Sequence, residues 1–263
     1  MSPRIGRTGG AAARAFGKGT AVRGKSGYFS PDTGSTLTTS LLSYYTLSAN
    51  STDLWGTSNG TDTSISYTTG KVGNGAIFNG STSQIALGVS AFDFEYNTAF
   101  SAAFWYKSSS NGNQTLLTKN TNWDNAPTYN SGWSIFIAAG GNGAIYCQLA
   151  TGNSSYKQQS STYPNAYNDG AWHFVVVTYD GSTNASGVNI YVDNVSRKTG
   201  SDFDTLGSNS IRNSTSMQFG KDTSGAHYLA GGLDEIGIWT KVLSATEKND
   251  LYNGGTGQTL TIL

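Results

Sequence analysis

Cysteine is nearly absent from this sequence of 263 residues, because Cys147 is the only one. A single cysteine excludes a disulfide within the chain and a metal centre built from several cysteines. Cys147 lies in the segment Ala-Ile-Tyr-Cys-Gln-Leu at residues 144–149, where its neighbours predict a buried strand residue rather than a nucleophile. The fold must therefore be stabilised by packing rather than by covalent cross-links.

Histidine is almost as rare, and the chain holds only His173 and His227. Neither belongs to a Gly-x-Ser-x-Gly turn or to a His-Glu-x-x-His metal helix. The sequence also lacks a glycine-rich phosphate loop and a Cys/His metal cluster. These absences argue against serine hydrolases, zinc peptidases and nucleotide-dependent enzymes, and no cofactor is expected to be required.

Long apolar runs are missing too. No stretch approaches the roughly 18 apolar residues of a membrane-spanning helix. The first ten residues, Met-Ser-Pro-Arg-Ile-Gly-Arg-Thr-Gly-Gly, lack the apolar centre of a secretory signal peptide. We therefore expect neither secretion by a signal peptide nor a membrane partner, and no nucleic-acid partner is expected either.

Charged side chains make up only 12% of the sequence, and the formal net charge is zero. This total hides an asymmetry, since residues 1–31 carry six basic and no acidic side chains while the rest of the chain carries a net charge of −6. The basic segment is either a solvated flexible terminus or an arm that docks on an acidic partner surface. Its basic residues are Arg4, Arg7, Arg14, Lys18, Arg23 and Lys25.

What the sequence does contain is a series of short β-prone runs between clusters of Ser, Thr, Asn and Gly, with 34 glycines and only 4 prolines. The clearest run is Trp172–Tyr179, in which both alternating faces carry bulky side chains, and a second run follows at 188–195. Both faces of the first run must be covered, which is typical of a central strand in a sandwich. Asp193 and Asn194 are placed to turn the chain after the second run. The pattern predicts a single all-β domain.

Two ordered segments resemble the laminin-G-like, concanavalin A-like jelly-roll family. The first is Trp-His-Phe-Val at 172–175, followed by Tyr-Asp-Gly at 179–181 and Ile-Tyr-Val-Asp at 190–193. The second is Gly-Leu-Asp-Glu-Ile-Gly-Ile-Trp at 232–239, which runs into residues 242–254 and is similar to the closing strand and short helix of the family. The resemblance implies fold more strongly than function, because this sandwich carries lectins, hydrolases, lyases and adhesive modules.

The expected fold is an all-β, two-sheet antiparallel jelly-roll sandwich with an extended N-terminal arm and one short C-terminal helix. We divide the chain into a basic Gly/Ala-rich arm at 1–31, a laminin-G-like domain at 32–254 whose sandwich begins near Leu41, and a tail at 255–263. The helix is predicted from Ser244 and Glu247, which form a capping-box pattern, and Gly254 is its expected stop. The side chains predicted on covered faces are Trp172, Phe174, Val176, Ile190, Ile236 and Trp239.

Neither catalysis nor calcium is strongly indicated by the resemblance. Endo-glucanases with this fold carry Glu-x-Asp-x-x-Glu on one strand, and residues 233–238 do not supply it, so the chain is not expected to be an enzyme. Relatives often bind calcium at the sandwich edge with carboxylate and backbone oxygens, and Asp234 matches the recurring acidic position. The alternative for Asp234 is a carboxylate that accepts hydrogen bonds from loop amides. Asn79 stands where an aspartate is commoner, which removes one metal ligand.

A glycan site is predicted in the loop at 120–130. Trp123 and Tyr129 lie there among Asn122, Asp124 and other amides, and a sugar site needs an exposed ring beside hydrogen-bonding groups. The alternative is that these two rings anchor the loop. The other tryptophans that lie within predicted strands, at positions 105, 133, 172 and 239, are expected in the core.

Two functional hypotheses follow. In the first, the chain is a non-enzymatic bacteriophage virion protein, such as a head decoration, head-fibre or tail-associated subunit. Its arm, which resembles the Gly/Ala/Arg leaders of phage structural proteins, would dock on capsid or other virion proteins within an oligomeric assembly, and its domain would face outward toward a cell-surface glycan. In the second, the chain is a bacterial extracellular carbohydrate-binding or adhesion module. A glycan-active enzyme is the third and least favoured alternative.

Overall fold

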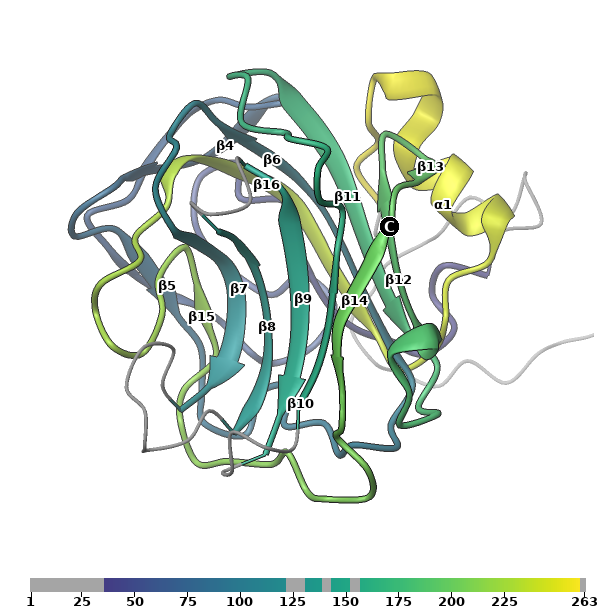
Figure 1. Cartoon of the computed structure of the whole chain (residues 1–263). Coiled ribbons are helices and arrows are strands. Elements are labelled where there is room, and N and C mark those ends of the chain that lie inside the picture. The colour runs from purple at the N-terminus through teal and green to yellow at the C-terminus, as the bar shows by residue number, and fades with distance from the viewer. Residues whose placement is uncertain (1–35, 122–130, 139–142, 152–156, 261–263) are drawn as a thin grey trace, which may run out of the picture.

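The computed structural model describes residues 36–121, 131–138, 143–151 and 157–260. Within these ranges the chain forms sixteen β-strands, one α-helix and two short 3-10 turns (Figure 1). The elements in chain order are β1 (Leu41–Tyr45), β2 (Thr61–Thr63), β3 (Ser66–Thr69), β4 (Asn74–Asn79), β5 (Gln84–Ala86), β6 (Phe100–Ser108), β7 (Gln114–Asn120), β8 (Gly132–Ile137), β9 (Ile145–Ala150), β10 (Lys157–Ser161), β11 (Trp172–Tyr179), η2 (Ala185–Gly187), β12 (Val188–Val192), β13 (Val195–Ser196), β14 (Gly200–Asp204), β15 (Gln218–Phe219), β16 (Ala230–Trp239), α1 (Ala245–Tyr252) and η3 (Asn253–Gly255).

The strands form two antiparallel sheets of eight. Sheet A has the order β13-β12-β11-β6-β16-β4-β3, with β1 also paired to β16, and sheet B has the order β14-β10-β9-β8-β7-β15-β5-β2. Strand β16 pairs with two strands along the same edge, because its first half pairs with β4 and its second half with β1. The expected two-sheet antiparallel jelly roll is confirmed.

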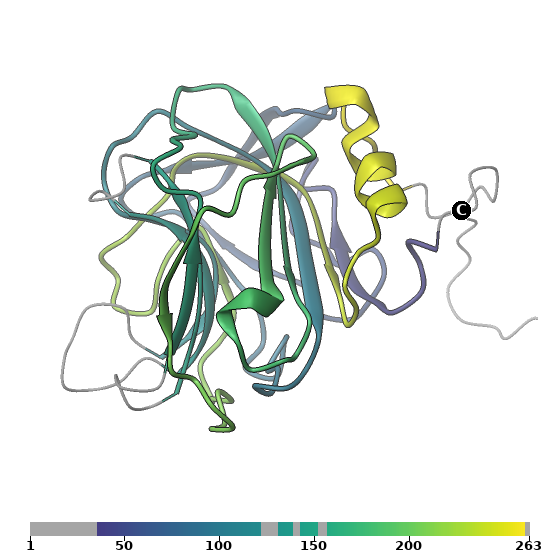
Figure 2. The same ribbon diagram turned by 45° about the vertical axis from the view of Figure 1, so that its right-hand side comes forward.

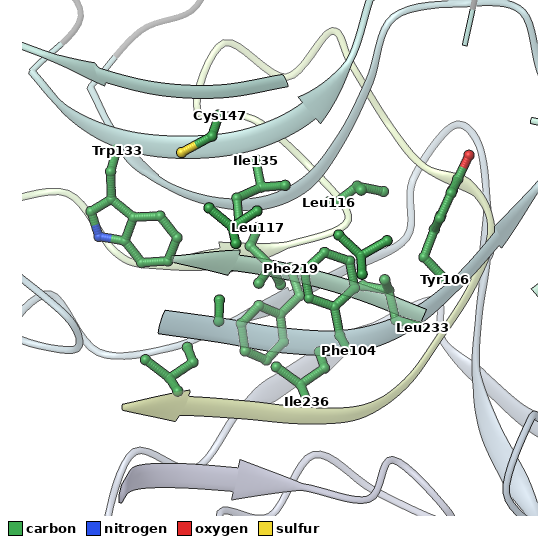
Figure 3. Packing of buried hydrophobic residues seen from close by; sticks show 14 of the residues in the cluster. Phe104, Tyr106, Leu116, Leu117, Trp133, Ile135, Cys147, Phe219, Leu233 and Ile236 are labelled. Atoms are coloured by element: carbon green, nitrogen blue, oxygen red, sulfur yellow. The ribbon is translucent and has the colours of Figure 1, made fainter. Parts of the chain in front are cut away.

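The main core lies between the two sheets (Figure 3). It follows from alternation: on β11, Val175 and Val177 point into this core, while Phe174 and Val176 belong to a second apolar cluster on the outer face of sheet A. Sheet B contributes Cys147, which is fully buried as predicted, and burial raises the pKa of its thiol to about 12.

The outer face of sheet A is covered by α1 and the segment that follows it, so the molecule has three layers (Figure 2). The predicted capping box is present, since the Ser244 hydroxyl accepts from the Glu247 amide and the Glu247 side chain accepts from the Ser244 amide. The helix ends at Tyr252, with Asn253 in the left-handed conformation at the C-cap and Gly254, the predicted stop, directly after it with a φ of +60°. Leu260 is buried in the same outer cluster.

The predicted turn after β12 is also confirmed, since Asp193 and Asn194 both have positive φ. Of the six residues predicted on covered faces, five are buried and Trp172 is only half-buried. Its place on β11 is as predicted, but the sequence pattern of one strand cannot show how much of the outer face its neighbours leave open. No helix among the described residues is long and apolar enough to cross a membrane.

Candidate functional site

Most residues of the predicted sites lie outside the described residues. This applies to Trp123, Tyr129, Asn122 and Asp124 of the predicted glycan site, and to all six basic residues of the arm. The described strands still fix where the glycan loop is attached: it leaves β7 after Asn120 and returns at β8, two neighbouring strands of sheet B. The glycan prediction for this loop stays a prediction.

Asp234 is fully buried on β16, on the outer face of sheet A. Its Oδ2 accepts hydrogen bonds from the backbone amides of Lys71 and Val72 at 2.8 and 2.9 Å, while Oδ1 has no hydrogen-bond partner within the part of the chain that the structure describes. Burial raises the pKa of this carboxyl to about 6, and the amides oppose that shift. Asp234 therefore holds the loop between β3 and β4, which is the alternative that the sequence left open.

The described surroundings of Asp234 offer few ligands to a calcium ion, and the calcium prediction stays a prediction. Calcium needs six to eight oxygen ligands, yet no group of three or more acidic, histidine or cysteine side chains suited to a metal exists among the described residues. Asn79 instead closes a turn, because its Oδ1 accepts from the amides of Ser81, Thr82 and Ser83. Two amide donors aimed at one Asp234 oxygen also oppose a cation there.

A cavity of about 610 Å³ lies beside β1. This volume falls within the range of roughly 300–1,000 Å³ that is common for ligand sites. Among the described residues, four with hydroxyl groups and several apolar ones line the cavity, and none that lines it carries a charge. The lining residues are Leu42, Ser43, Leu54, Trp55, Gly56, Thr57, Ser58, Ser90, Ala91 and Phe92.

The loop that forms one wall of this cavity is organised by Asp53, which is 4% exposed. One carboxylate oxygen accepts from the amides of Trp55 and Gly56 at 3.1 and 2.8 Å, and the other from the Ser43 hydroxyl and the Ser58 amide at 2.7 and 2.9 Å. Both oxygens of the Asp53 carboxylate are thus engaged in hydrogen bonds within the protein. The wall is preorganised and presents no net charge to a ligand.

Gly56 is required by this arrangement, since a Cβ there would lie 2.4 Å from the carbonyl oxygen of Leu42. The indole N–H of Trp55 donates to the carbonyl oxygen of Leu41 at 2.8 Å, which fixes the ring, and the ring remains partly exposed. The opposite wall comes from the turn at 88–92, where Phe92 has a φ of +53°. The site therefore combines a fixed aromatic ring with hydroxyl groups.

None of the described residues that line this cavity is acidic or a histidine. The described acids with raised pKa values are Asp234 and Glu235, neighbours on β16, and neither lines the cavity. Glu235 is buried, accepts a hydrogen bond from the Thr259 hydroxyl, and burial raises its pKa to about 8.

A family description named "Concanavalin A-like lectin/glucanases superfamily" matches residues 78–247. The chain belongs to this superfamily. No curated protein sequence matches the chain significantly. The superfamily name covers both lectins and glucanases, so membership settles the fold and leaves the activity open.

Solved structures with the superfamily fold are similar to this chain at low identity. The binding domain of Paraclostridial Mosquitocidal Protein 1 gives a TM-score of 0.62 at 17% identity, covering 84% of this chain and 53% of that one. The botulinum neurotoxin serotype D ligand binding domain in complex with N-acetylneuraminic acid gives 0.59 at 16%, covering 83% and 52%. Domain 4 of AbnA, an extracellular arabinanase from Geobacillus stearothermophilus, in complex with arabinotriose, gives 0.51 at 18%, covering 83% and 98%.

The chain thus spans about half the length of the toxin domains and nearly the whole of the arabinanase domain. Trp55 was not among the residues predicted from the sequence to bind a ligand. The available signal was an aromatic residue between Asp53 and Gly56 in a Ser/Thr-rich segment. What could not be read from it is the second wall, which comes from residues 88–92.

Proposed function

We propose that this chain is a non-enzymatic glycan-binding module that takes a neutral sugar in the cavity beside Trp55. The observation that carries the proposal is the lining of that cavity by the described residues: the fixed Trp55 ring, the hydroxyls of Thr57, Ser58 and Ser90, and no charged group. Apolar sugar faces pack against aromatic rings, and sugar hydroxyls exchange hydrogen bonds with protein hydroxyls. A neutral cavity favours a neutral ligand, because an ion would lose its hydration without a partner.

The similar structures are consistent with a binding role. The arabinanase domain is described in complex with arabinotriose and the neurotoxin domain with N-acetylneuraminic acid, so this fold accommodates sugars in other proteins. At 16–18% identity these similarities support the fold, and the role of this chain rests on its own cavity.

The test is a glycan array with a blocked cavity. Ser90→Phe fills the cavity from an exposed turn, and Val89→Phe adds the same bulk at the neighbouring exposed position that does not line it. Neutral glycans should bind the parent and Val89→Phe but not Ser90→Phe, with both variants keeping the melting temperature of the parent. No binding by the parent, or equal binding by Ser90→Phe, would contradict the proposal.

A further variant separates the cavity from the loop predicted by sequence. Trp123→Ala/Tyr129→Ala should bind the same glycans as the parent if the cavity is the site. Loss of binding in this double variant, with binding retained in Ser90→Phe, would move the site to the loop and overturn the assignment to the cavity.

We also propose that residues 1–31 dock the domain on an acidic surface of a virion, where it would serve as a decoration, head-fibre or tail-associated subunit. The support is the excess of six basic side chains over a body with net charge −6. Deletion of 1–31 should leave a folded domain that no longer co-sediments with purified particles, and attachment of the full chain should weaken with salt. Equal co-sedimentation of the two forms would favour the alternative, a bacterial extracellular carbohydrate-binding or adhesion module.

A further inference from the structure

A second hollow, of about 220 Å³, lies at one end of sheet A and shares no lining residue with the cavity beside Trp55. It is smaller than the roughly 300–1,000 Å³ of drug-sized ligand sites, so its occupant is about one sugar ring in size. The lining residues are Thr69, Ile77, Lys107, Ser108, Ser109, Gly170, Trp172, Ala230, Gly231 and Gly232.

The hollow follows from the register of four strands. Trp172 on β11 is opposite Lys107 on β6, Lys107 is opposite Gly232 on β16, and Gly232 is opposite Ile77 on β4. A Cβ at Gly232 would lie 2.6 Å from Cη2 of Trp172 and 3.2 Å from Cδ1 of Ile77. The missing side chain at Gly232 therefore lets the Trp172 ring lie against β16, beside the hollow that both residues line.

Trp172 differs from three other tryptophans in its hydrogen bonding. The indole N–H groups of Trp55, Trp133 and Trp239 donate to the backbone carbonyls of Leu41, Phe92 and Leu37.

Within the described residues, by contrast, the Trp172 indole N–H has no hydrogen-bond partner. A half-buried tryptophan with an unused donor is suited to a ligand that offers an acceptor.

The charge of this hollow is positive. Lys107 is exposed and is the only charged side chain in its lining, and no described acid forms an ion pair with it. The nearest acid in sequence to the lining, Asp169, already contacts His173 at 3.1 Å. The hydroxyls of Ser109 and Thr69 are exposed beside Lys107.

We propose that this hollow binds an acidic sugar of the uronic acid type. The sugar ring packs against Trp172, its carboxylate accepts hydrogen bonds from Lys107 Nζ, and the exposed hydroxyls of Ser109 and Thr69 contact ring hydroxyls. A charge-assisted hydrogen bond is about twice as strong as a neutral one, which gives the carboxylate the deciding role in selecting the ligand. The site is independent of the neutral-sugar cavity beside Trp55.

The experiment is an NMR titration of ¹⁵N-labelled full-length protein with D-glucuronate, D-glucose and acetate. Glucuronate should shift the Trp172 indole resonance saturably. Glucose and acetate should each bind at least about tenfold more weakly, because glucose lacks the carboxylate and acetate lacks the sugar ring. Lys107→Met should weaken glucuronate binding about tenfold or more. Lys221→Met, at a half-exposed lysine outside this hollow, should have no effect.

The proposal would be overturned by no saturable shift with glucuronate, by equal affinity for glucose, or by unchanged binding in Lys107→Met. Acetate binding as tightly as glucuronate would reduce the hollow to a carboxylate site without sugar recognition and would also overturn it. Ser90→Phe should leave glucuronate binding intact, so failure of the cavity beside Trp55 and failure of this hollow are told apart.

Discussion

The core between the sheets and the layer that covers the outer face of sheet A differ in how they use charge. The inter-sheet cluster consists of aliphatic and aromatic side chains with one thiol. The outer layer contains three buried carboxylates, Asp234, Glu235 and Glu247, beside its own apolar cluster. Each carboxylate contacts a segment distant in sequence: Lys71 and Val72, Thr259, and Thr36 respectively.

The difference indicates two ways of stabilising a layer. The two sheets bury a continuous apolar cluster against each other, and burial of this apolar surface drives their association. The outer layer is assembled from separate loops and one short helix, so hydrogen bonds to buried carboxylates select where each piece docks. Stability of the outer layer should therefore depend on pH, while that of the inter-sheet core should not.

The largest effect is expected from Phe104→Ala. Phe104 is fully buried between the sheets (Figure 3), and removal of a buried phenylalanine ring costs about 3–5 kcal/mol of unfolding free energy. Because no titrating group takes part, urea denaturation should give the same loss at pH 5 and pH 8. A loss that changes between these two pH values would break the distinction between the layers.

Glu247→Gln should have the second largest effect. Burial raises the pKa of Glu247, but hydrogen bonds from Lys241, Thr36 and Ser244 outweigh it and hold the pKa at about 2. The folded pKa is below the unfolded value of about 4.3, so this contribution is present above pH 4.3 and is lost as the pH falls toward 2. The variant should lose about 1.5–3 kcal/mol at pH 7, and the gap to the parent should narrow in acid. A difference in unfolding free energy between variant and parent that stays constant down to pH 2.5 would show that the charge of Glu247 does not cause it.

Glu235→Gln should raise the stability of the protein, whereas Glu247→Gln should lower it. Burial raises the pKa of Glu235 to about 8, above the unfolded value of about 4.3. The folded state then retains a proton that the unfolded state loses, so the parent loses stability as the pH rises from about 4.3 to 8. Glutamine removes this slope, and the variant should be more stable than the parent by on the order of 1–2 kcal/mol at pH 8.5 and equal to it at pH 4. Equal stability at pH 8.5 would show that the carboxylate is solvated in the folded protein.

His173→Asn should have the smallest effect. Burial lowers the pKa of His173, but hydrogen bonds to Asp193 and Asp169 outweigh it and raise the pKa. This contribution is present below the unfolded pKa of about 6.5 and is lost as the pH rises through the folded value. Because Asp169 is exposed, the variant should lose only about 0.5–1 kcal/mol at pH 5.5, and less at pH 9. A larger loss at pH 9 than at pH 5.5 would reverse the assigned sign.

Local patterns in the sequence predicted much of the fold. The alternation of large side chains at 172–179 predicted the bounds of β11, and the Ser244–Glu247 pair predicted the start of α1. Both signals lie within a few residues and depend on backbone geometry alone. For Asp234 the sequence left two alternatives, a calcium ligand or an acid that accepts hydrogen bonds from loop amides. The structure shows the hydrogen bonds of the second alternative.

The candidate sites could not be predicted in the same way, because each depends on segments far apart in the sequence. The cavity beside Trp55 needs the turn at 88–92, and the position of the Trp172 ring needs a glycine at position 232, two strands away. The bulge in β16 between Asp234 and Gly237, where Glu235 has a φ of +51°, is another example. Pairing partners, rather than local propensity, decide these features.

The proposed function is tested most directly by following the Trp55 indole resonance of the full-length protein while a neutral oligosaccharide selected on the array is added. The account predicts a saturable shift of this resonance in the parent and in Val89→Phe, and no shift in Ser90→Phe. A Trp55 resonance that does not move while the glycan binds, or one that moves equally in Ser90→Phe, would contradict a sugar site in this cavity.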